Sequence, residues 1–412
     1  MASDAAPPSV VADAQQLNCR LETSFARLEA FRDTWDHATS RLGGSIYLSY
    51  DWSRLWWEFY GAGKALRIFV LSSADEIVAI LPLFIEVIGF GPFRLKIARL
   101  VGSNIPPKVF DPPVAPACAD AVFEHVLRQL FCEEGCDALS FGPVSKLHSS
   151  VEALLRASRR APGLVAQVSR TSGNVHSVWH LPETIDAYFQ SLSRNERKNR
   201  KADLKKLQAE YGGRVEVVHA PVQLEAEFEA FRQQHAAQWV PEGKSGHFGA
   251  WPRAAEFNRA LVQAHGRLGR VRFVRILASG KTIANLYAYV FGGCYYCELP
   301  ARSLDPQWDR FSLGPAGIVA TISAAIGDGM TRMEGGLSHY DYKLRLNAQE
   351  YATTIIRLVA NRPSSRLRFS VFIRLRACAQ FAYDALWRER LLPHLPACLR
   401  RPQWRAWLAL DF

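Results

Sequence analysis

The sequence predicts a mixed α/β protein in which one structural unit occurs twice. Two segments, 66–85 and 271–290, align without a gap, and each has the pattern of a strand, a short polar turn and a second apolar strand. An aromatic helix precedes each of them, at 51–61 and at 251–266. The same order repeated along a chain indicates an internal duplication. The length of 412 residues also exceeds the size at which single cores usually stop growing, so two domains are expected.

Changes in composition divide the chain into four segments. Residues 1–16 are expected to be a flexible leader, followed at 17–165 by a degenerate N-terminal copy of the unit. The complete C-terminal copy is placed at 170–363, with its first strand at 177–182. Residues 364–412 form a tail rich in arginine and aromatic residues, which we predict to be helical and basic.

Charge and cysteine content restrict the possible partners. The net charge of +11 favours a polyanionic partner, whether nucleotide, nucleic acid or anionic lipid. A hydrophobic content of 49% excludes a disordered chain. Of the eight cysteines, only Cys132/Cys136 and Cys294/Cys297 are close pairs, and neither has a further ligand at zinc spacing. No metal site is therefore expected, and free thiols in a reducing cytoplasm are the favoured interpretation.

The most strongly charged stretch of the chain is predicted to be a helix. Ser193 followed three residues later by Glu196 forms a capping box, and glycines from Gly212 onwards end the helix. Its apolar stripe, extended backwards, passes through Arg200 or Lys201 and then Arg197, of which Arg200 and Arg197 are assigned to the inner side. These two side chains are expected to face the body or a cleft, where a buried cation needs a carboxylate, a carbonyl or a phosphate. The alternative is a wholly solvated basic face.

A second helix start has the features of an anion site. Segment 294–330 predicts a strand, a polar loop and a helix, and glycine and proline lie at the start of that helix, at 312–317. Free backbone N–H groups and the positive end of the helix dipole can receive an anion there, and glycines permit close approach. Pro315 is tolerated because its missing N–H would have no partner in the first turn.

The order of these motifs resembles the bacterial acyltransferases of the GNAT superfamily known as the BioF2-like or CelD type. The helix is followed by TRMEGGLSHYDYKLRLNAQ at 331–349, which supplies the acidic residue and the "G…YK" of that pattern. Segments 231–248 and 192–212 are also similar to the family. The resemblance covers about 177–360 well and 45–140 as a degenerate copy. It implies tandem GNAT-like domains, as in FemABX-like transferases, each a mixed, mostly antiparallel sheet flanked by helices.

The resemblance implies that an acyl group moves from coenzyme A to an amine or hydroxyl acceptor by direct attack on the thioester, without a permanently bound cofactor. Acyl-coenzyme A would lie in a V-shaped split between two strands, with its pyrophosphate at the predicted anion site. The segment departs from the common Q/R-x-x-G-x-G/A phosphate loop of GNAT enzymes. The residues assigned to this co-substrate are Arg310, Ser312, Leu313, Gly314, Ala316 and Gly317.

Four residues are the leading candidates for the chemistry, although each could instead be a structural polar group. A general base must reach the acceptor nitrogen. Glu298, on the strand that would border the thioester, and His235 are the main alternatives, and Glu334 and the group at 339–341 are further candidates for the base. Tyr342 could donate a proton to the thiolate leaving group. Lys343, which is expected on a strand, matches the ligand-facing lysine of the family. Substrate-binding roles are predicted for a further set: Arg197, Arg200, Trp239, Phe248, Glu334 and His339.

The acceptor and the location follow from the tail and from the ends of the chain. Arginines alternate with apolar residues in 364–412, and tryptophans follow as interfacial anchors. This pattern predicts contact with an anionic membrane surface, and the alternative is a helix packed on the body. The N-terminus lacks the pattern of a signal peptide. We expect a cytoplasmic protein, or one peripheral on the inner face of the plasma membrane, acting in cell-envelope, lipid or polysaccharide metabolism.

Two other functions compete with this one. A FemABX-like transferase would take its donor from aminoacyl-tRNA, which would explain the basic surplus differently. A non-enzymatic nucleic-acid-binding protein would use the basic helix at 194–211. That stretch lacks interleaved aromatics, and the chain has no zinc-knuckle, RNP or KH pattern. No nucleic-acid partner is therefore expected.

Overall fold

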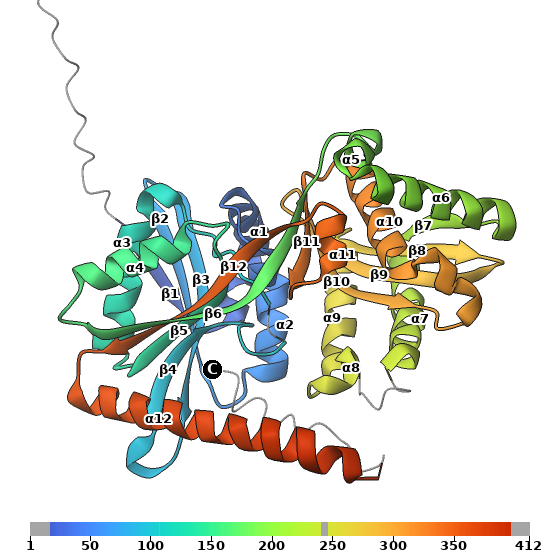
Figure 1. Cartoon of the computed structure of the whole chain (residues 1–412). Coiled ribbons are helices and arrows are strands. Elements are labelled where there is room, and N and C mark those ends of the chain that lie inside the picture. Colours follow the sequence, from blue (N-terminus) through green and yellow to red (C-terminus); the bar gives the residue numbers. More distant parts are fainter. Residues whose placement is uncertain (1–16, 107, 240–245, 397–412) are drawn as a thin grey trace, which may run out of the picture.

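The computed structural model describes residues 17–106, 108–239 and 246–396. Its strands form one 12-stranded sheet (Figure 1). The strand at 95–100 pairs in parallel with the strand at 138–145, and the strand at 294–302 pairs in parallel with the strand at 332–337. The other neighbouring pairs are antiparallel. In sheet order the strands are β1 (Asn18–Glu22), β2 (Ala65–Ser73), β3 (Glu76–Ile88), β4 (Leu95–Leu100), β5 (Ala138–Ser145), β12 (Gln349–Ala360), β6 (Val165–His180), β11 (Arg332–Leu337), β10 (Cys294–Arg302), β9 (Lys281–Phe291), β8 (Val271–Ala278) and β7 (Arg214–Val218).

Helices flank this sheet in both halves of the molecule. The α-helices are α1 (Arg32–Arg41), α2 (Tyr50–Tyr60), α3 (Ala119–Arg128), α4 (Ser150–Arg160), α5 (Ile185–Ser191), α6 (Arg194–Tyr211), α7 (Pro221–Trp239), α8 (His247–Ala250), α9 (Ala254–Arg267), α10 (Leu313–Gly327), α11 (Asp341–Arg345) and α12 (Pro363–Phe381). Short 3-10 segments are η1 (Phe25–Phe31), η2 (Ile46–Leu48), η3 (Gly91–Phe93), η4 (Pro116–Cys118), η7 (Pro306–Phe311) and η9 (Leu392–His394). The π-helical segments are η5 (Gln129–Glu133) and η8 (Ala382–Leu391).

The structure confirms that the repeated segments have the same architecture. β2 with β3, and β8 with β9, are antiparallel hairpins, and each half contains one parallel strand pair. The aromatic helices that precede the hairpins, α2 and α9, pack on one another. Phe257 lies edge-on to Trp52 and Tyr60, with ring centroids 6.3 and 5.3 Å apart. The junction between the halves is therefore an aromatic core.

Two long strands carry the sheet across the middle of the molecule. β12 pairs with β5 on one side and with β6 on the other. β6 pairs with β12 along most of its length and with β11 over His176–His180. The predicted boundary at 165–170 therefore falls inside β6, and the strand predicted at 177–182 is only its end. Hydrophobic periodicity did not locate this strand, because its partners change along its length.

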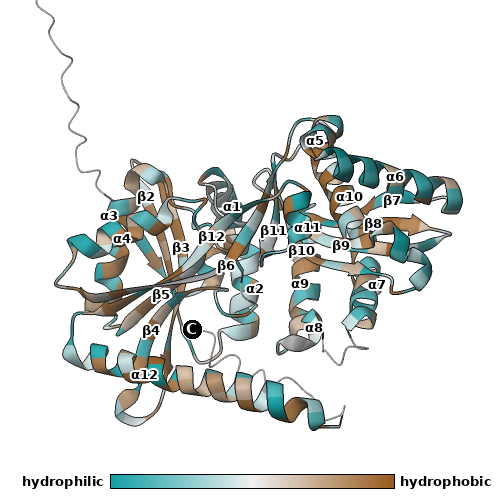
Figure 2. Cartoon of the chain, viewed as in Figure 1, coloured by the Kyte–Doolittle hydropathy of each residue, from teal (hydrophilic) through white to brown (hydrophobic). Residues whose placement is uncertain are grey.

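The basic helix has the predicted limits. The Ser193 hydroxyl accepts the backbone N–H of Glu196 at 3.2 Å, and Gly212 ends α6 with a φ of 60°. Leu207 is the buried anchor of the helix, and most of the remaining surface is hydrophilic (Figure 2).

The helical C-terminal region begins with α12, which packs on β4 and β12 (Figure 1). Phe369 is buried in a cluster with Leu95 and Ile97, and the Ser365 hydroxyl donates to Asp137 at 2.5 Å. None of the described helices combines the length and apolar character needed to cross a membrane. The predicted leader at 1–16 and the end of the tail at 397–412 lie outside the described residues.

Candidate active site

A split in the sheet lies in the second half. β10 and β11 pair in parallel only from Cys294 with Arg332 to Tyr296 with Glu334. Beyond this point β10 continues beside β9 to Arg302, whereas β11 continues only beside β6, to Leu337. Two parallel strands that part in this way leave main-chain groups and side chains facing a gap. Both cavities described below are lined by residues of these strands beyond the last paired residues.

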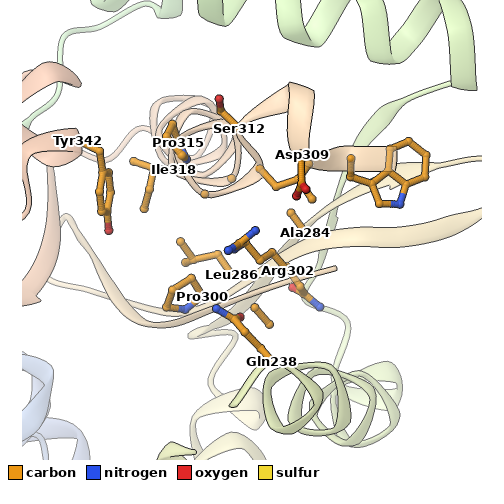
Figure 3. A pocket seen from close by; sticks show the side chains of 16 residues that line it. Gln238, Ala284, Leu286, Pro300, Arg302, Asp309, Ser312, Pro315, Ile318 and Tyr342 are labelled. Atoms are coloured by element: carbon orange, nitrogen blue, oxygen red, sulfur yellow. The ribbon is translucent and has the colours of Figure 1, made fainter. Parts of the chain in front are cut away.

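The larger cavity has a volume of about 370 Å³ and lies between β9, the end of β10 and the start of α10 (Figure 3). Leu286 and Pro300 form its apolar floor, and Gln238 of α7 and Tyr342 of α11 close two sides. Its shape is therefore that of a cleft between a sheet and a helix start.

The start of α10 is open toward this cavity. A Cβ atom added at Gly314 would meet nothing within 4 Å, and at Gly317 it would meet only Ala284, at 4.0 Å. The first turn contains no acidic residue, and the Ser312 side chain makes no capping hydrogen bond. Backbone N–H groups at a helix start without a side-chain cap can receive an anion.

The residues predicted to bind coenzyme A fall into two groups. Ser312, Leu313, Gly314 and Gly317 line the cavity, whereas Ala316 is buried in the helix packing. Arg310 is not among the lining residues. Its guanidinium donates to Glu210 at 2.6 Å and to the Tyr211 hydroxyl at 2.7 Å.

Arg302 is a lining residue that the sequence reasoning missed. It ends β10, and its guanidinium points into the cavity, with the Asp309 carboxylate on the opposite wall (Figure 3). A basic residue at the end of the strand that faces a glycine-bearing helix start was the available signal. The cleft thus offers one cation and free main-chain donors to a bound phosphate.

The smaller cavity, of about 210 Å³, lies where β10 and β11 part. Both halves of the chain contribute to it, since Tyr47, Lys108 and Val109 belong to the first half. The other lining residues come from β6, α8, β10 and β11: His176, His247, Cys297, Glu298, Leu299, Glu334, Gly335, Gly336 and Leu337. The site is therefore composite.

Glu298 is the central carboxylate of the smaller cavity, and its side chain is only 2% exposed. One oxygen accepts the Tyr47 hydroxyl at 2.9 Å, and the other is paired with the Lys108 ammonium. Burial raises the pKa of Tyr47 well above its ordinary value, so this hydroxyl keeps its proton and donates it. These partners lie 251 and 190 residues away in the sequence, where no spacing pattern could indicate them.

Glu334 belongs to a second buried network in the same cavity. Its carboxylate lies 3.3 Å from Nε2 of His176 and 3.1 Å from the Arg332 guanidinium. Burial alone would raise the pKa of Glu334, but the hydrogen bond from His176 and the Arg332 charge bring it below the ordinary value. Arg332 also lies 3.9 Å from Asp111, which pairs with His148 at 2.9 Å. The network joins β11 and β6 to a loop of the first half.

Tyr342 and Lys343 lie in the short helix α11, and not on a strand as predicted for the lysine. Tyr342 lines the larger cavity. The Lys343 ammonium donates to the carbonyls of Gly335 at 3.0 Å and Ser338 at 3.2 Å. Burial lowers the pKa of Lys343 to about 8. The lysine thus holds the end of β11, which lines the smaller cavity.

His235, Trp239 and Phe248 form an aromatic cluster beside the end of β10. Nδ1 of His235 lies 3.1 Å from the Pro300 carbonyl, and Nε2 is 3.4 Å from the backbone N–H of His247. The ring centroids of Phe248 and Trp239 lie 5.6 and 6.1 Å from that of His235. Burial lowers the pKa of His235, so a neutral ring that donates to the carbonyl and accepts the N–H fits both contacts.

The remaining predicted residues lie away from the two cavities. His339 is exposed and pairs with Glu350 at 2.9 Å and with Asp341 at 3.1 Å. Arg200 is buried as predicted, and the carboxylates of Glu196 and Asp203, each at 2.9 Å, satisfy it within its own helix.

Arg197 is half-buried on the same helix, and neither arginine of α6 is among the lining residues of the two cavities. Among the described residues, no group of three or more His, Cys, Asp or Glu side chains is placed to hold a metal ion.

A parallel strand pair parts beside a glycine-bearing helix start in the second half of the chain. Residues 194–344 match the model of the acetyltransferase (GNAT) domain. This part of the chain is therefore a GNAT-type acetyltransferase domain, and the match supports an acyltransferase of the N-acetyltransferase-like kind.

Comparison with the crystal structure of FemX shows a similar fold. The crystal structure of FemX aligns at a TM-score of 0.59 and 11% identity, covering 82% of this chain and 98% of FemX. L-PGS from Bacillus licheniformis aligns at 0.47 and 10% identity, covering 82% and 94% of the two chains. A tandem GNAT protein from the clavulanic acid biosynthesis pathway aligns at 0.40 and 13% identity, covering 84% and 99%. No curated protein matches the sequence.

Proposed function

We propose that the protein is an acyl-coenzyme A-dependent N-acyltransferase of the BioF2-like or CelD type, acting on an acceptor of cell-envelope, lipid or polysaccharide metabolism. The supporting observation is the pair of cavities along β10. One has the open start of α10 and Arg302, which suit a pyrophosphate, and the other has the buried carboxylate of Glu298. A thioester bound in the first cavity would reach the second at the point where the strands part.

The proposed chemistry uses three side chains. The amine of the acceptor attacks the thioester carbonyl, so that a C–N bond forms and the C–S bond breaks. Glu298 takes the proton that the nitrogen loses, and the Tyr342 hydroxyl gives a proton to the leaving thiolate. Solvent then returns the proton from Glu298 to Tyr342. We favour Glu298 over His235 as the base, because Glu298 lines the smaller cavity whereas His235 is not among the lining residues of either cavity.

Transfer from aminoacyl-tRNA is the second candidate, motivated by the likeness to FemX, which is a likeness of fold alone. A thermal-shift comparison separates the two. Acetyl-coenzyme A or a longer acyl-coenzyme A should raise the melting temperature, and tRNA should not. Stabilisation by tRNA alone would refute the proposed donor. The nucleic-acid-binding alternative has less support, because the buried arginine of α6 is neutralised within its helix.

The start of α10 provides the sharper test of coenzyme A binding. Gly314→Asp places a carboxylate where the pyrophosphate would lie, and like-charge repulsion should weaken binding about 100-fold. Gly327→Asp is the matched control, since Gly327 ends the same helix and has open space around it. Calorimetric titration with coenzyme A should show the loss only in the first variant. Equal affinity in both folded variants would contradict the placement.

We also propose that α12 rests on an anionic membrane surface. Leu367, Leu375 and Phe381 are 60%, 50% and 67% exposed, and Arg366 and Arg374 are exposed beside them. Apolar side chains flanked by arginine match the chemistry of a lipid interface with anionic headgroups. Vesicles of phosphatidylglycerol and phosphatidylcholine should carry the protein in flotation, and pure phosphatidylcholine should not. A variant with both Leu375→Glu and Phe381→Glu should not float with these vesicles. Flotation unchanged by the two substitutions would contradict the proposal.

A further inference from the structure

The ammonium group of Lys108 lies in a site made of two aromatic rings and a carboxylate. Its nitrogen is 5.2 Å from the ring centroid of Tyr47 and 5.8 Å from that of Trp52, and it is paired with Glu298. Aromatic faces attract cations through the ring quadrupole, most strongly where water is excluded. A carboxylate with two aromatic walls is therefore a recognition site for an ammonium group.

The three host side chains are held in place by contacts other than Lys108. All three are buried, and the Tyr47 hydroxyl donates to Glu298 at 2.9 Å. Tyr47 packs edge-on against Trp52 at 4.9 Å, and Trp52 packs against Tyr289 at 5.2 Å. Removal of the lysine would therefore leave the host largely in place.

The lysine comes from a different part of the chain than its carboxylate partner. Lys108 precedes a segment held to the first half by the hydrogen bond from Phe110 N–H to the Pro143 carbonyl at 2.9 Å. Glu298 lies on β10 of the second half. Lys108, Tyr47 and the proposed base Glu298 all line the smaller cavity. The ammonium thus lies where the nitrogen of an acceptor would have to be.

We propose that Tyr47, Trp52 and Glu298 form the recognition site for the ammonium group of the acceptor, and that Lys108 occupies this site as a tethered mimic until the acceptor displaces it. The acceptor class is a primary amine on an unhindered alkyl carbon, the shape of the lysine end. A neutral hydroxyl would gain neither the charge attraction of Glu298 nor the cation–π contacts. The role as acceptor site rests on the proposed acyl transfer, but the ammonium site itself does not.

Lys108→Met tests the site, because methionine keeps an apolar side chain of similar length and removes the charge. The probe is methylammonium chloride, titrated without coenzyme A and compared with sodium chloride at equal ionic strength. The variant should bind the probe at least about tenfold more tightly than the wild type, because the competing intramolecular cation is gone. Lys146→Met, which removes an exposed lysine outside the site, should behave as the wild type.

A double variant and a chemical probe complete the test. Lys108→Met with Glu298→Gln should lose the gain in methylammonium affinity, and an equal affinity with and without Glu298 would overturn the proposal. So would a Lys108→Met protein that binds no better than the wild type. In the wild type, trimethylammonium should increase reductive methylation of Lys108, measured by peptide mass spectrometry. A reactivity unchanged at saturating probe would also overturn the proposal, even if the variants failed to fold.

The result is separable from the proposed function. The titrations contain no acyl-coenzyme A, so failure of acyl transfer would leave the ammonium affinities as they are. If the variants showed no ammonium site but coenzyme A still bound at the start of α10, the proposed acceptor class would be wrong. The proposed donor site would still stand.

Discussion

Glu298 is held by residues that only the folded chain brings near it. The sequence indicated Glu298 as a carboxylate on an apolar strand, and it indicated Gly314 at an anion-binding helix start. It could not indicate Tyr47 or Lys108, because their contacts with Glu298 depend on how the two halves pack. Sequence reasoning also assigned Arg310 to the phosphate, whereas the arginine that lines the cleft is Arg302.

The first prediction concerns Glu298 as the general base. Glu298→Gln keeps the shape of the side chain and removes its ability to take a proton, so kcat should fall by about 100-fold or more. The KM for acyl-coenzyme A should stay the same, because Glu298 does not line the larger cavity. Release of free thiol measures both constants, and Glu58→Gln, at an exposed carboxylate, is the control. An unchanged kcat would exclude Glu298 as the base.

The two arginines near α10 give a paired prediction. Arg302→Ala removes the cation that points into the cleft and should raise the KM for acyl-coenzyme A about tenfold, the effect of one charge-assisted contact. Arg310→Ala should leave this KM within about twofold. Arg310 is exposed, and the substitution would remove only its surface contacts with Glu210 and Tyr211. Initial rates at varied acyl-coenzyme A concentrations distinguish them. If Arg310→Ala raised this KM more than Arg302→Ala did, Arg310 rather than Arg302 would be the phosphate contact.

Lys343 gives a prediction about stability and pH. Its pKa is lowered by burial to about 8, from a model-peptide value near 10.5. Between these values the unfolded chain binds one more proton than the folded chain, so stability rises with pH from about 8 to about 10.5, by at most about 1.4 kcal/mol per pH unit. Below about pH 8 both states are protonated and this slope disappears.

Urea unfolding at pH 8 and pH 10, compared between the wild type and Lys343→Met, isolates this contribution. The wild type should gain about 2 kcal/mol more than the variant over this interval. Other titrating groups contribute to both proteins and cancel in the comparison. A parallel pH response of the two proteins would show that the lysine remains charged when it is buried.

At the scale of elements, the two copies of the unit differ where a donor would bind. In the second half, β10 and β11 part and α10 begins with open glycines. In the first half, Phe110 forms a parallel bridge with Val144 of β5, and Phe110 is fully buried. The helix that corresponds to α10 is α3, which has Asp120 in its first turn.

These differences predict one acyl-coenzyme A site per chain. The segment around Phe110 fills the split of the first half, and a carboxylate at the start of α3 would repel a pyrophosphate. Isothermal titration with a non-hydrolysable acyl-coenzyme A analogue should give a stoichiometry of one. Asp120→Ala, which removes the acidic charge but leaves the filled split, should leave it at one. A stoichiometry of two would contradict the assignment of the first half as a degenerate copy.

The elements that the sequence predicted best are those with local signals. The capping box and the glycine fix the limits of α6, and alternating apolar residues with polar turns fix the hairpins. The limits of β6 depend on long-range pairing with β12 and β11, and no local pattern marks them. Lys343 was expected on a strand because the short helix α11 has only one turn, too little for helical periodicity to appear.

At the scale of the whole molecule, β6 and β12 make the two halves one structure. β12 is the last strand of the second half but pairs with β5 of the first half, and the smaller cavity takes Tyr47 and Lys108 from the first half. The length of the chain and its repeated unit had predicted two domains. In the sheet order, neither half keeps all its strand partners without the other.

The last prediction follows from this continuity. The full chain should unfold in urea in one transition, with tryptophan fluorescence and far-UV circular dichroism giving the same midpoint. A fragment of residues 170–363 begins inside β6 and lacks β5, so β12 would present an unpaired edge that favours aggregation. A fragment of 17–381 keeps both strands with their partners and is the control. If 170–363 were soluble and cooperatively folded, the second half would be an independent domain, and the contribution of Tyr47 and Lys108 to the site would depend on docking rather than on a shared sheet.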